Sequence, residues 1–431
     1  MGGGFGPGYY RAGLTTLSPL AAESTRMPDL TSGPLAGRTR LPRALMLAGL
    51  AMLGPFSVVT YMPSFPEIER TFSVTPLQMQ LTVSAYMATF SVMSLFHGAI
   101  SDSFGRRPVV LVNLMVFMAA TIGCGLAQDF RDLLWFRALQ GLSAGAGMVI
   151  SRAMIRDSFV GHEAQRMIAM VTMIFGLAPA IAPIIGGWLQ LAFGWRSVFV
   201  FLALFTAVLF ACSYWRLSET LPHAARQPFA PRPLTRNYLK LLGSLRFGLL
   251  SSAIAFNFAG LFLYISSAPV IVYELLHLNE NQFAWLFVPA ISGFMFGAFM
   301  SGRLAGKLTP HSTIRTGYTV MIVATAFSIV YHAMFPPALP WTVLPVMVYT
   351  IGMSLAVPNL TLFVLDLFPH NRGLAASLQA FQQAMFNAIV AGAVSPHVSG
   401  TGLGLAATTA VFLTCGAGCA FIYSRLPTRK E

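Results

Sequence analysis

Charged residues are scarce in this sequence. Asp, Glu, Lys and Arg make up 10% of the 431 residues, whereas hydrophobic residues make up 55%. Soluble globular domains carry about 25% charged residues, and a soluble chain of this length would form two or three domains with charged surfaces. The charges here are too few to cover such surfaces, so lipid must be the solvent. The composition therefore indicates a polytopic membrane protein.

Cysteine is also rare. All four cysteines, Cys124, Cys212, Cys415 and Cys419, lie within apolar segments. Cys415 and Cys419 are four residues apart and share a helix face, but no His or carboxylate stands nearby to complete a metal site. We expect buried, unreactive thiols, no disulfide framework, no metal and no cofactor.

Several function classes are excluded by motifs that the sequence lacks. It has no GxxxxGK[ST] loop for a nucleotide, and no nucleophile–base pair, carboxylate pair or His–carboxylate metal site at membrane depth. The net charge is +13, yet there is no lysine-rich run and no nucleic-acid-binding motif. We therefore expect neither an enzyme, nor a nucleotide-driven pump, nor a nucleic-acid partner.

Long apolar segments divide the chain. A spanning helix needs about 20 largely apolar residues, and about twelve such segments occur, six on each side of a basic stretch. This pattern predicts an all-α polytopic membrane protein with a disordered tail (1–42), a six-helix bundle (43–215), a linker (216–246), a second six-helix bundle (247–424) and a short tail (425–431). The predicted helices lie at 44–63, 77–100, 108–126, 133–155, 167–190, 197–215, 247–273, 283–304, 314–335, 341–365, 373–396 and 403–424.

Lys and Arg are distributed unevenly along this pattern. All but four of the 27 fall in the tails, in the linker or at alternate loops. The exceptions are Arg70, Arg131 and Arg196 in the other loops and Arg137 within a helix. Cytoplasmic loops of membrane proteins collect positive charge, so we expect both termini to be cytoplasmic.

A charged loop follows the second apolar segment. It reads HGAISDSFGRRPVVL from residue 97, and AFMSGRLAGKL echoes it from residue 298. An internal duplication around a basic linker implies two bundles that face each other across a midplane site. We expect Gly98 to allow close helix packing, Gly105 to allow a tight turn, and Asp102 to face the positive end of the helix that begins near Gly373.

This loop resembles the GxxxD-x-x-GRR signature of the major facilitator superfamily. The resemblance implies a major facilitator fold whose two halves are latched together in one state and released in the other. It also implies that Arg106 pairs with Asp157. A basic turn that serves only membrane topology is the alternative. The residues of the implied latch are Gly98, Asp102, Gly105, Arg106, Arg107 and Asp157.

The fourth predicted helix carries an arginine inside the bilayer. RALQGLSAGAG resembles the second motif of the family, with Arg137, Gln140, Gly141 and Gly145 at matching positions. Arginine at such a depth costs about 3 kcal/mol or more, so it is expected to face a cavity or a partner. Two interpretations of Arg137 stay open. Either it has a role in transport, or it is a structural residue that donates hydrogen bonds to helix carbonyls and to Gln140.

The fifth predicted helix contains APIIGG, which resembles the Gly-Pro-x-x-Gly-Gly motif of the family's antiporters, with Ala182 in place of the first glycine. Pro179 and Pro183 bend the helix, and Gly186 and Gly187 permit close contact with the opposite half. The resemblance implies export by antiport, although packing alone would also explain the glycines.

The first predicted helix contains PFSVVTYMPSFP, which resembles the bicyclomycin-resistance (Bcr/CflA) subfamily of drug:proton antiporters. That subfamily commonly has an aspartate two residues before the tyrosine, where Val59 stands here. No Asp or Glu lies well inside any predicted helix, which leaves Arg137 as the only deeply placed charge. Without a carboxylate to anchor cations, neutral or anionic amphiphiles become the more plausible substrates.

Candidates for proton coupling lie at the helix ends. They are Asp102, Asp157, Glu67 and His97, although a lone histidine is more often a structural donor. Substrate is expected to meet polar and aromatic side chains from both halves. The candidates are Tyr61, Gln80, Tyr86, Arg137, Asn257, Tyr264, Gln379, Gln382, Gln383 and Asn387.

Taken with the resemblance, these features predict a secondary active transporter in a bacterial inner membrane. We expect a monomer that exports small amphipathic drugs or metabolites by alternating access, driven by protons. Two alternatives stay open. One is a proton symporter that imports a small organic acid at Arg137, and the other is an uncoupled facilitator.

Overall fold

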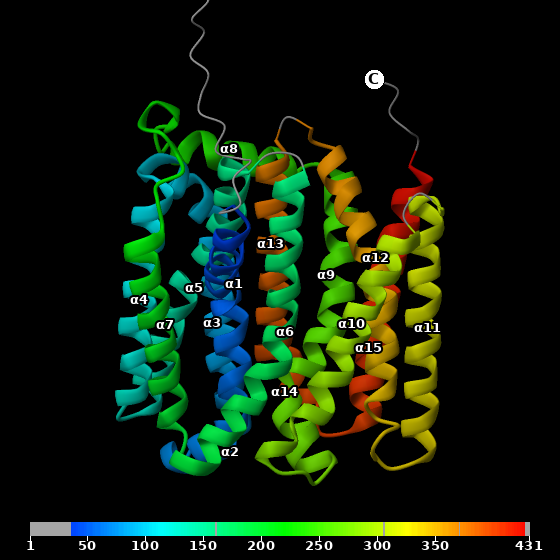
Figure 1. Cartoon of the computed structure of the whole chain (residues 1–431). Coiled ribbons are helices and arrows are strands. Elements are labelled where there is room, and N and C mark those ends of the chain that lie inside the picture. Colours follow the sequence, from blue (N-terminus) through cyan, green and yellow to red (C-terminus); the bar gives the residue numbers. More distant parts are fainter. Residues whose placement is uncertain (1–35, 160–161, 305–306, 370, 427–431) are drawn as a thin grey trace, which may run out of the picture. The chain divides into compact units, whose positions relative to one another are not determined.

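The computed structural model describes residues 36–159, 162–304, 307–369 and 371–426. The predicted disordered tail lies outside this part of the chain except for residues 36–42. The chain divides into two compact units, residues 1–42 and 43–431. The described part of the second unit is built of helices joined by turns and loops (Figure 1). The α-helices are α1 (Ala36–Tyr61), α2 (Phe65–Phe72), α3 (Pro76–Phe104), α4 (Arg106–Leu126), α5 (Phe130–Ser158), α6 (His162–Phe193), α7 (Arg196–Arg216), α8 (Pro231–Leu242), α9 (Leu245–Ser266), α10 (Ala284–Leu304), α11 (Pro310–Met334), α12 (Leu344–Asp366), α13 (Arg372–Ile389), α14 (Ser395–Val398) and α15 (Gly402–Arg425).

Eleven helical segments in the described residues are long and apolar enough to span a membrane. They match eleven of the twelve predicted segments. The remaining predicted helix, 373–396, corresponds to α13, the π-helical turn η5 (Val390–Val394) and α14. Its amide side chains lower its hydropathy, so composition alone does not mark it as a span.

Helix starts follow from local capping. The Thr75 side chain accepts a hydrogen bond from the Gln78 amide, and the Gln78 side chain accepts one from the Thr75 amide, which is a capping box at the start of α3. Asp129 caps α5 in a similar way, by accepting from the Asp132 amide at 2.8 Å. α3 ends at Gly105, whose φ of +99° suits glycine and few other residues.

The helices pack through small residues. α3 packs on α5, α4 packs on α5 and α7, and in the second half of the chain α9 packs on α15 and α11 on α12. In the α11–α12 pair, a Cβ on Gly317 would lie 2.6 Å from the Gly352 carbonyl oxygen. Such close backbone approach is how membrane helices gain packing energy, because lipid offers no hydrophobic driving force between helices. The halves of the chain on either side of the linker meet mainly where α3 packs on α13 and where α6 packs on α10.

The predicted linker contains a helix that the sequence analysis did not anticipate. Figure 1 shows α8 across the same end of the molecule as the last turn of α15. Tyr238 on α8 is 7% exposed, and its hydroxyl donates to the Leu95 carbonyl of α3 at 2.8 Å. Burial raises the pKa of this phenol to about 12, so it stays protonated as a donor at neutral pH. The division into two bundles and a linker stays a prediction.

Candidate transport site

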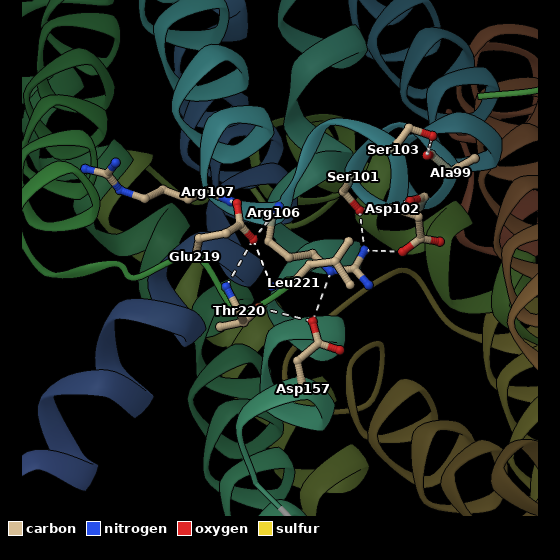
Figure 2. A network of polar contacts seen from close by, with 11 residues as sticks. Ala99, Ser101, Asp102, Ser103, Arg106, Arg107, Asp157, Glu219, Thr220 and Leu221 are labelled. Atoms are coloured by element: carbon tan, nitrogen blue, oxygen red, sulfur yellow. Dashed lines mark hydrogen bonds and ion pairs between the residues drawn. The ribbon is translucent and has the colours of Figure 1, made fainter. Parts of the chain in front are cut away.

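The charged turn between α3 and α4 forms a compact network (Figure 2). Arg106 is 7% exposed and bridges two carboxylates, with Nη1 2.5 Å from Asp102 Oδ1 and Nε 3.1 Å from Asp157 Oδ2. Its Nη1 also donates to Ser101 Oγ at 2.6 Å. The predicted contact between Arg106 and Asp157 is present, and it ties the α3–α4 turn to the end of α5.

Glu219, at the start of the linker, completes this network. Its carboxylate accepts from the amides of Arg106 at 3.0 Å and Arg107 at 3.2 Å, the first two residues of α4. It also accepts from the amides of Thr220 and Leu221. A carboxylate at a helix N-terminus satisfies orphan amides and complements the helix dipole. Glu219 is not among the residues predicted from the sequence, although an acidic residue three positions after the basic helix end at Arg216 was the available signal.

The other members of the predicted latch are placed differently. The Arg107 guanidinium donates to the Tyr214 carbonyl at 2.7 Å. Asp102 and Gly373 line the same polar cavity of about 390 Å³, but the ion pair of Asp102 is with Arg106. The expected close packing at Gly98 is wrong for this structure, because a Cβ there would meet only Val149 at an ordinary 3.8 Å. Gly105 does need to be small, since a Cβ would lie 2.5 Å from a Glu219 carboxylate oxygen.

Arg137 is enclosed within the first half of the chain. It is 0% exposed, and its guanidinium carbon lies 4.6 Å from the Tyr61 ring centroid and 4.5 Å from the Tyr86 ring centroid. Its Nη1 donates to Gln140 Oε1 at 2.8 Å, and Gln140 in turn donates to Thr121 Oγ1 at 2.7 Å. Cation–π stacking and one amide thus stabilise the charge. Of the expected structural bonds, the one to Gln140 is present, whereas Nε and Nη2 have no hydrogen-bond partner among the described residues. The enclosure by two tyrosines favours a structural role of Arg137 over a substrate contact.

The second half of the chain has its own buried polar cluster. Asn257 donates to the Tyr318 hydroxyl at 2.9 Å, and the Tyr349 hydroxyl donates to the Asn257 carbonyl at 2.9 Å. Tyr264, predicted with Asn257 as a substrate contact, is 6% exposed. These residues connect α9 to α11 and α12.

The predicted amide side chains of α13 join neighbouring helices. Gln382 donates to Ser252 Oγ at 2.8 Å, and Gln379 donates to Thr361 Oγ1 at 3.3 Å. Asn387 is 6% exposed and Gln383 is partly buried. Gln80 on α3 makes a similar hydrogen bond. It donates to the Ser266 carbonyl of α9 at 2.8 Å, and this bond connects the two halves of the chain. These hydrogen bonds hold neighbouring helices together, and contact of the amides with substrate stays a prediction.

An apolar cavity of about 290 Å³ lies between helices from both halves of the chain. α1, α5 and α6 contribute one side, and α9 and α10 contribute the other. None of the ten predicted substrate residues lines it. Arg152 on α5 is the one charged residue in its described lining, although the sequence analysis had Arg137 as the only deeply placed charge. Among its apolar lining residues are Met148, Phe258, Leu261, Ile265, Phe287 and Phe294.

The halves meet tightly at the end opposite α8. Gly187 on α6 packs so closely on the Glu280 carbonyl oxygen that a Cβ would overlap it, while Gly186 packs in the same way on Thr60. The Tyr273 hydroxyl donates to the Pro63 carbonyl at 2.8 Å. The expected contact of this glycine pair with the opposite half is therefore made through Gly187. Both predicted prolines, Pro179 and Pro183, lie inside α6.

The remaining proton-coupling candidates have polar partners. Glu67 accepts from the Trp195 amide at 3.0 Å and from the Gln190 side chain. His97 is 1% exposed, and its Nε2 lies 3.3 Å from Asn113 Oδ1. Their role in proton transfer stays a prediction.

The cysteines are not all buried as expected. Cys124 is buried, whereas Cys212 and Cys415 are exposed. Within the described ranges, no group of three or more His, Cys, Asp or Glu side chains could hold a metal ion.

A polytopic helical chain, a charged turn after its second span and a cavity between its halves together define a class of membrane transporter. The chain belongs to the Major Facilitator Superfamily, whose profile matches residues 45–390. It is accordingly a secondary transporter of small molecules, embedded in the membrane by many helices, and not an enzyme.

Three relatives narrow the position within the family. The uncharacterized MFS-type transporter YdgK of Bacillus subtilis is 30% identical over 377 residues, which cover 87% of this chain and 91% of that protein. A bicyclomycin resistance protein homolog of Haemophilus influenzae is 28% identical, covering 65% of this chain and 70% of its own. Multidrug resistance protein D of Escherichia coli is 28% identical, covering 84% and 91%. The resemblance to the bicyclomycin-resistance subfamily is thereby confirmed.

The fold also matches solved transporters. A bacterial homolog of the human lysosomal transporter Spinster, in an inward-facing and occupied conformation, superposes with a TM-score of 0.70 at 19% identity. The match covers 91% of this chain and 98% of that chain. It confirms the predicted all-α major facilitator fold.

Proposed function

We propose that this transporter exports small amphipathic compounds by alternating access, driven by proton entry. The observation that carries the proposal is the apolar cavity between the two halves of the chain. The halves also meet tightly at the end opposite α8, through Gly187 and Tyr273. An apolar cavity of this kind suits amphipathic ligands. Relatives named for bicyclomycin and multidrug resistance support the direction of transport.

The conformational switch in this proposal is the charged network at the α8 end. Arg106, Asp102, Asp157 and Glu219 hold the α3–α4 turn, the end of α5 and the linker in one arrangement. Protonation of a carboxylate there would weaken an ion pair of Arg106 and shift the equilibrium between two states. Asp102 and Asp157 are therefore the preferred coupling residues, with both chain termini in the cytoplasm of a bacterial cell.

One observation favours the uncoupled facilitator as a second candidate. In the described spans, every Asp and Glu lies near a helix end, so no carboxylate stands at mid-membrane depth to carry protons. The proton symporter of an organic acid is less favoured, because its intended anion site at Arg137 is enclosed by Tyr61 and Tyr86.

The test uses purified protein in liposomes that contain a pH-sensitive dye, with an imposed proton gradient. Amphiphiles of each charge class are added in turn. If the protein is an antiporter, at least one compound should trigger proton movement out of the dye-loaded liposomes. The Asp157→Asn variant should abolish this proton movement. Compounds that cross down their own gradients without proton movement would instead establish a facilitator.

A further inference from the structure

The cavity between the halves combines an apolar lining with a single guanidinium. Phe258, Leu261, Phe287 and Phe294 form much of its wall, and Arg152 enters from α5. The volume of about 290 Å³ is near the lower limit for small-molecule sites. A ligand that fills it must therefore be small, largely apolar and compatible with a positive charge.

Arg152 differs from the other inward-placed arginine of this helix. Arg137 is 0% exposed and stacked between two tyrosines, whereas Arg152 is exposed within the cavity. The side-chain ion pairs of the described residues involve Arg106, Arg226 and Arg372, and none involves Arg152. A guanidinium in an apolar, membrane-embedded cavity is costly without a counter-charge. The chemistry of this cavity therefore favours an anion.

The surrounding charges reinforce this preference. Arg156 follows one turn later on α5 and lines the neighbouring polar cavity of about 390 Å³. The apolar cavity has no carboxylate among its described lining residues. A cation would therefore meet repulsion from two arginines, while a neutral amphiphile would leave the guanidinium unpaired.

We propose that the cavity binds lipophilic organic anions, with a carboxylate or sulfonate paired to Arg152 and an alkyl or aromatic body against the phenylalanines of α9 and α10. This inference rests on the proposed function, because it takes the cavity as the transport site. Arginine is suited to such a role, since its planar fork binds carboxylates through two parallel hydrogen bonds. Arg152 is a substrate-binding residue in this assignment, and Arg137 is not.

Equilibrium binding to the full chain in a non-ionic detergent tests the assignment. The probe is radiolabelled para-hexylbenzoate, and its competitors are the methyl ester and the para-hexylbenzylammonium cation, which share the same body. We expect the anion to bind wild type at least about tenfold more tightly than either analogue, in line with a charge-assisted hydrogen bond. Arg152→Gln should weaken anion binding by a similar factor, and Arg152→Lys by less.

Arg131→Gln is the matched control, because it removes the same charge from the opposite end of the same helix and Arg131 does not line the apolar cavity. This variant should bind the anion with an affinity within about twofold of the wild-type affinity. Equal binding of anion and ester by wild type would overturn the assignment without any variant, so a folding defect in Arg152→Gln cannot obscure it. Unchanged anion binding by folded Arg152→Gln would also overturn it.

The binding assay needs no proton gradient, which separates the two claims. Anion binding that depends on Arg152, in a protein that moves no protons, would contradict the proposed function alone. Proton-coupled movement of the cation, unaffected by Arg152→Gln, would contradict this assignment alone.

Discussion

Arg106 Nε and Asp157 Oδ2 lie 3.1 Å apart, and this contact joins the turn after α3 to the last turn of α5. The same guanidinium holds Asp102 at 2.5 Å. One nearly buried arginine thus fixes two helix ends. We propose that the conformational switch of this transporter depends on that bridge.

The first prediction concerns the bridge itself. Asp157→Asn removes one of the two charges that stabilise Arg106, so transport should fall about tenfold or more while the protein still reaches the membrane. Transport rate and membrane abundance are measured together. The matched control is Asp366→Asn, which breaks the exposed Arg372–Asp366 pair, whose side chains are 60% and 65% exposed. Exposed pairs contribute little, so that variant should behave as wild type. Equal effects of the two variants would contradict the account.

The second prediction concerns the cap on α4. Glu219→Ala leaves the Arg106 and Arg107 amides without their acceptor, which should cost about 1 kcal/mol and lower the melting temperature by a few degrees. Glu219→Gln keeps an acceptor oxygen and should recover part of the loss. Thermal unfolding in detergent measures both variants. A melting temperature that stays at the wild-type value in Glu219→Ala would rule out a stabilising cap.

The third prediction concerns closure at the end opposite α8. Gly187→Ala places a methyl group against the Glu280 carbonyl oxygen, so α6 must move away from the second half of the chain. We expect transport to fall severalfold, because the closed arrangement is destabilised. Gly418→Ala is the control, since nothing lies within 4 Å of a Cβ at that site. A Gly187→Ala protein as active as Gly418→Ala would show that this contact is dispensable.

The fourth prediction separates the two readings of Arg137. Truncation to Ala removes the charge between Tyr61 and Tyr86 and the bond to Gln140, and it leaves an unfilled space. The melting temperature should fall by at least about 5 °C. Thermal unfolding and binding of para-hexylbenzoate are measured on the same preparation. Loss of binding with an unchanged melting temperature would mean that Arg137 contacts substrate after all.

Structural features that are set by residues close together in the sequence could be predicted from it. Gly105 at a turn follows from a local motif, whereas the pairing of Arg106 with Asp157, which joins different helices, was implied only by the resemblance to the family. The spans follow from long apolar segments, and the segment 373–396 was predicted with the others although its amides lower its hydropathy. Helix α8 was not predicted from the sequence, because it has few apolar residues and its basic residues suggested a linker.

Features that depend on helix rotation could not be predicted. Arg137 and Arg152 lie on the same helix, and the sequence shows only that Arg137 is further from the charged loops. Arg152 lies close to the end of α5 in the sequence, yet it lines the cavity together with residues of α6 and α10. Gly98 was similarly misjudged, since close approach depends on which neighbour faces it.

Distances between the two halves, measured at both ends of the same protein, test the central claim most directly. Spin labels at Ser103 and Ser377 report on the α8 end, and labels at Leu191 and Asn281 report on the opposite end, in a background that lacks the four native cysteines. Double electron–electron resonance is recorded at mildly alkaline and mildly acidic pH, with and without para-hexylbenzoate. Alternating access predicts that the two distances change in opposite directions. Distances that stay fixed, or that lengthen together, would contradict it.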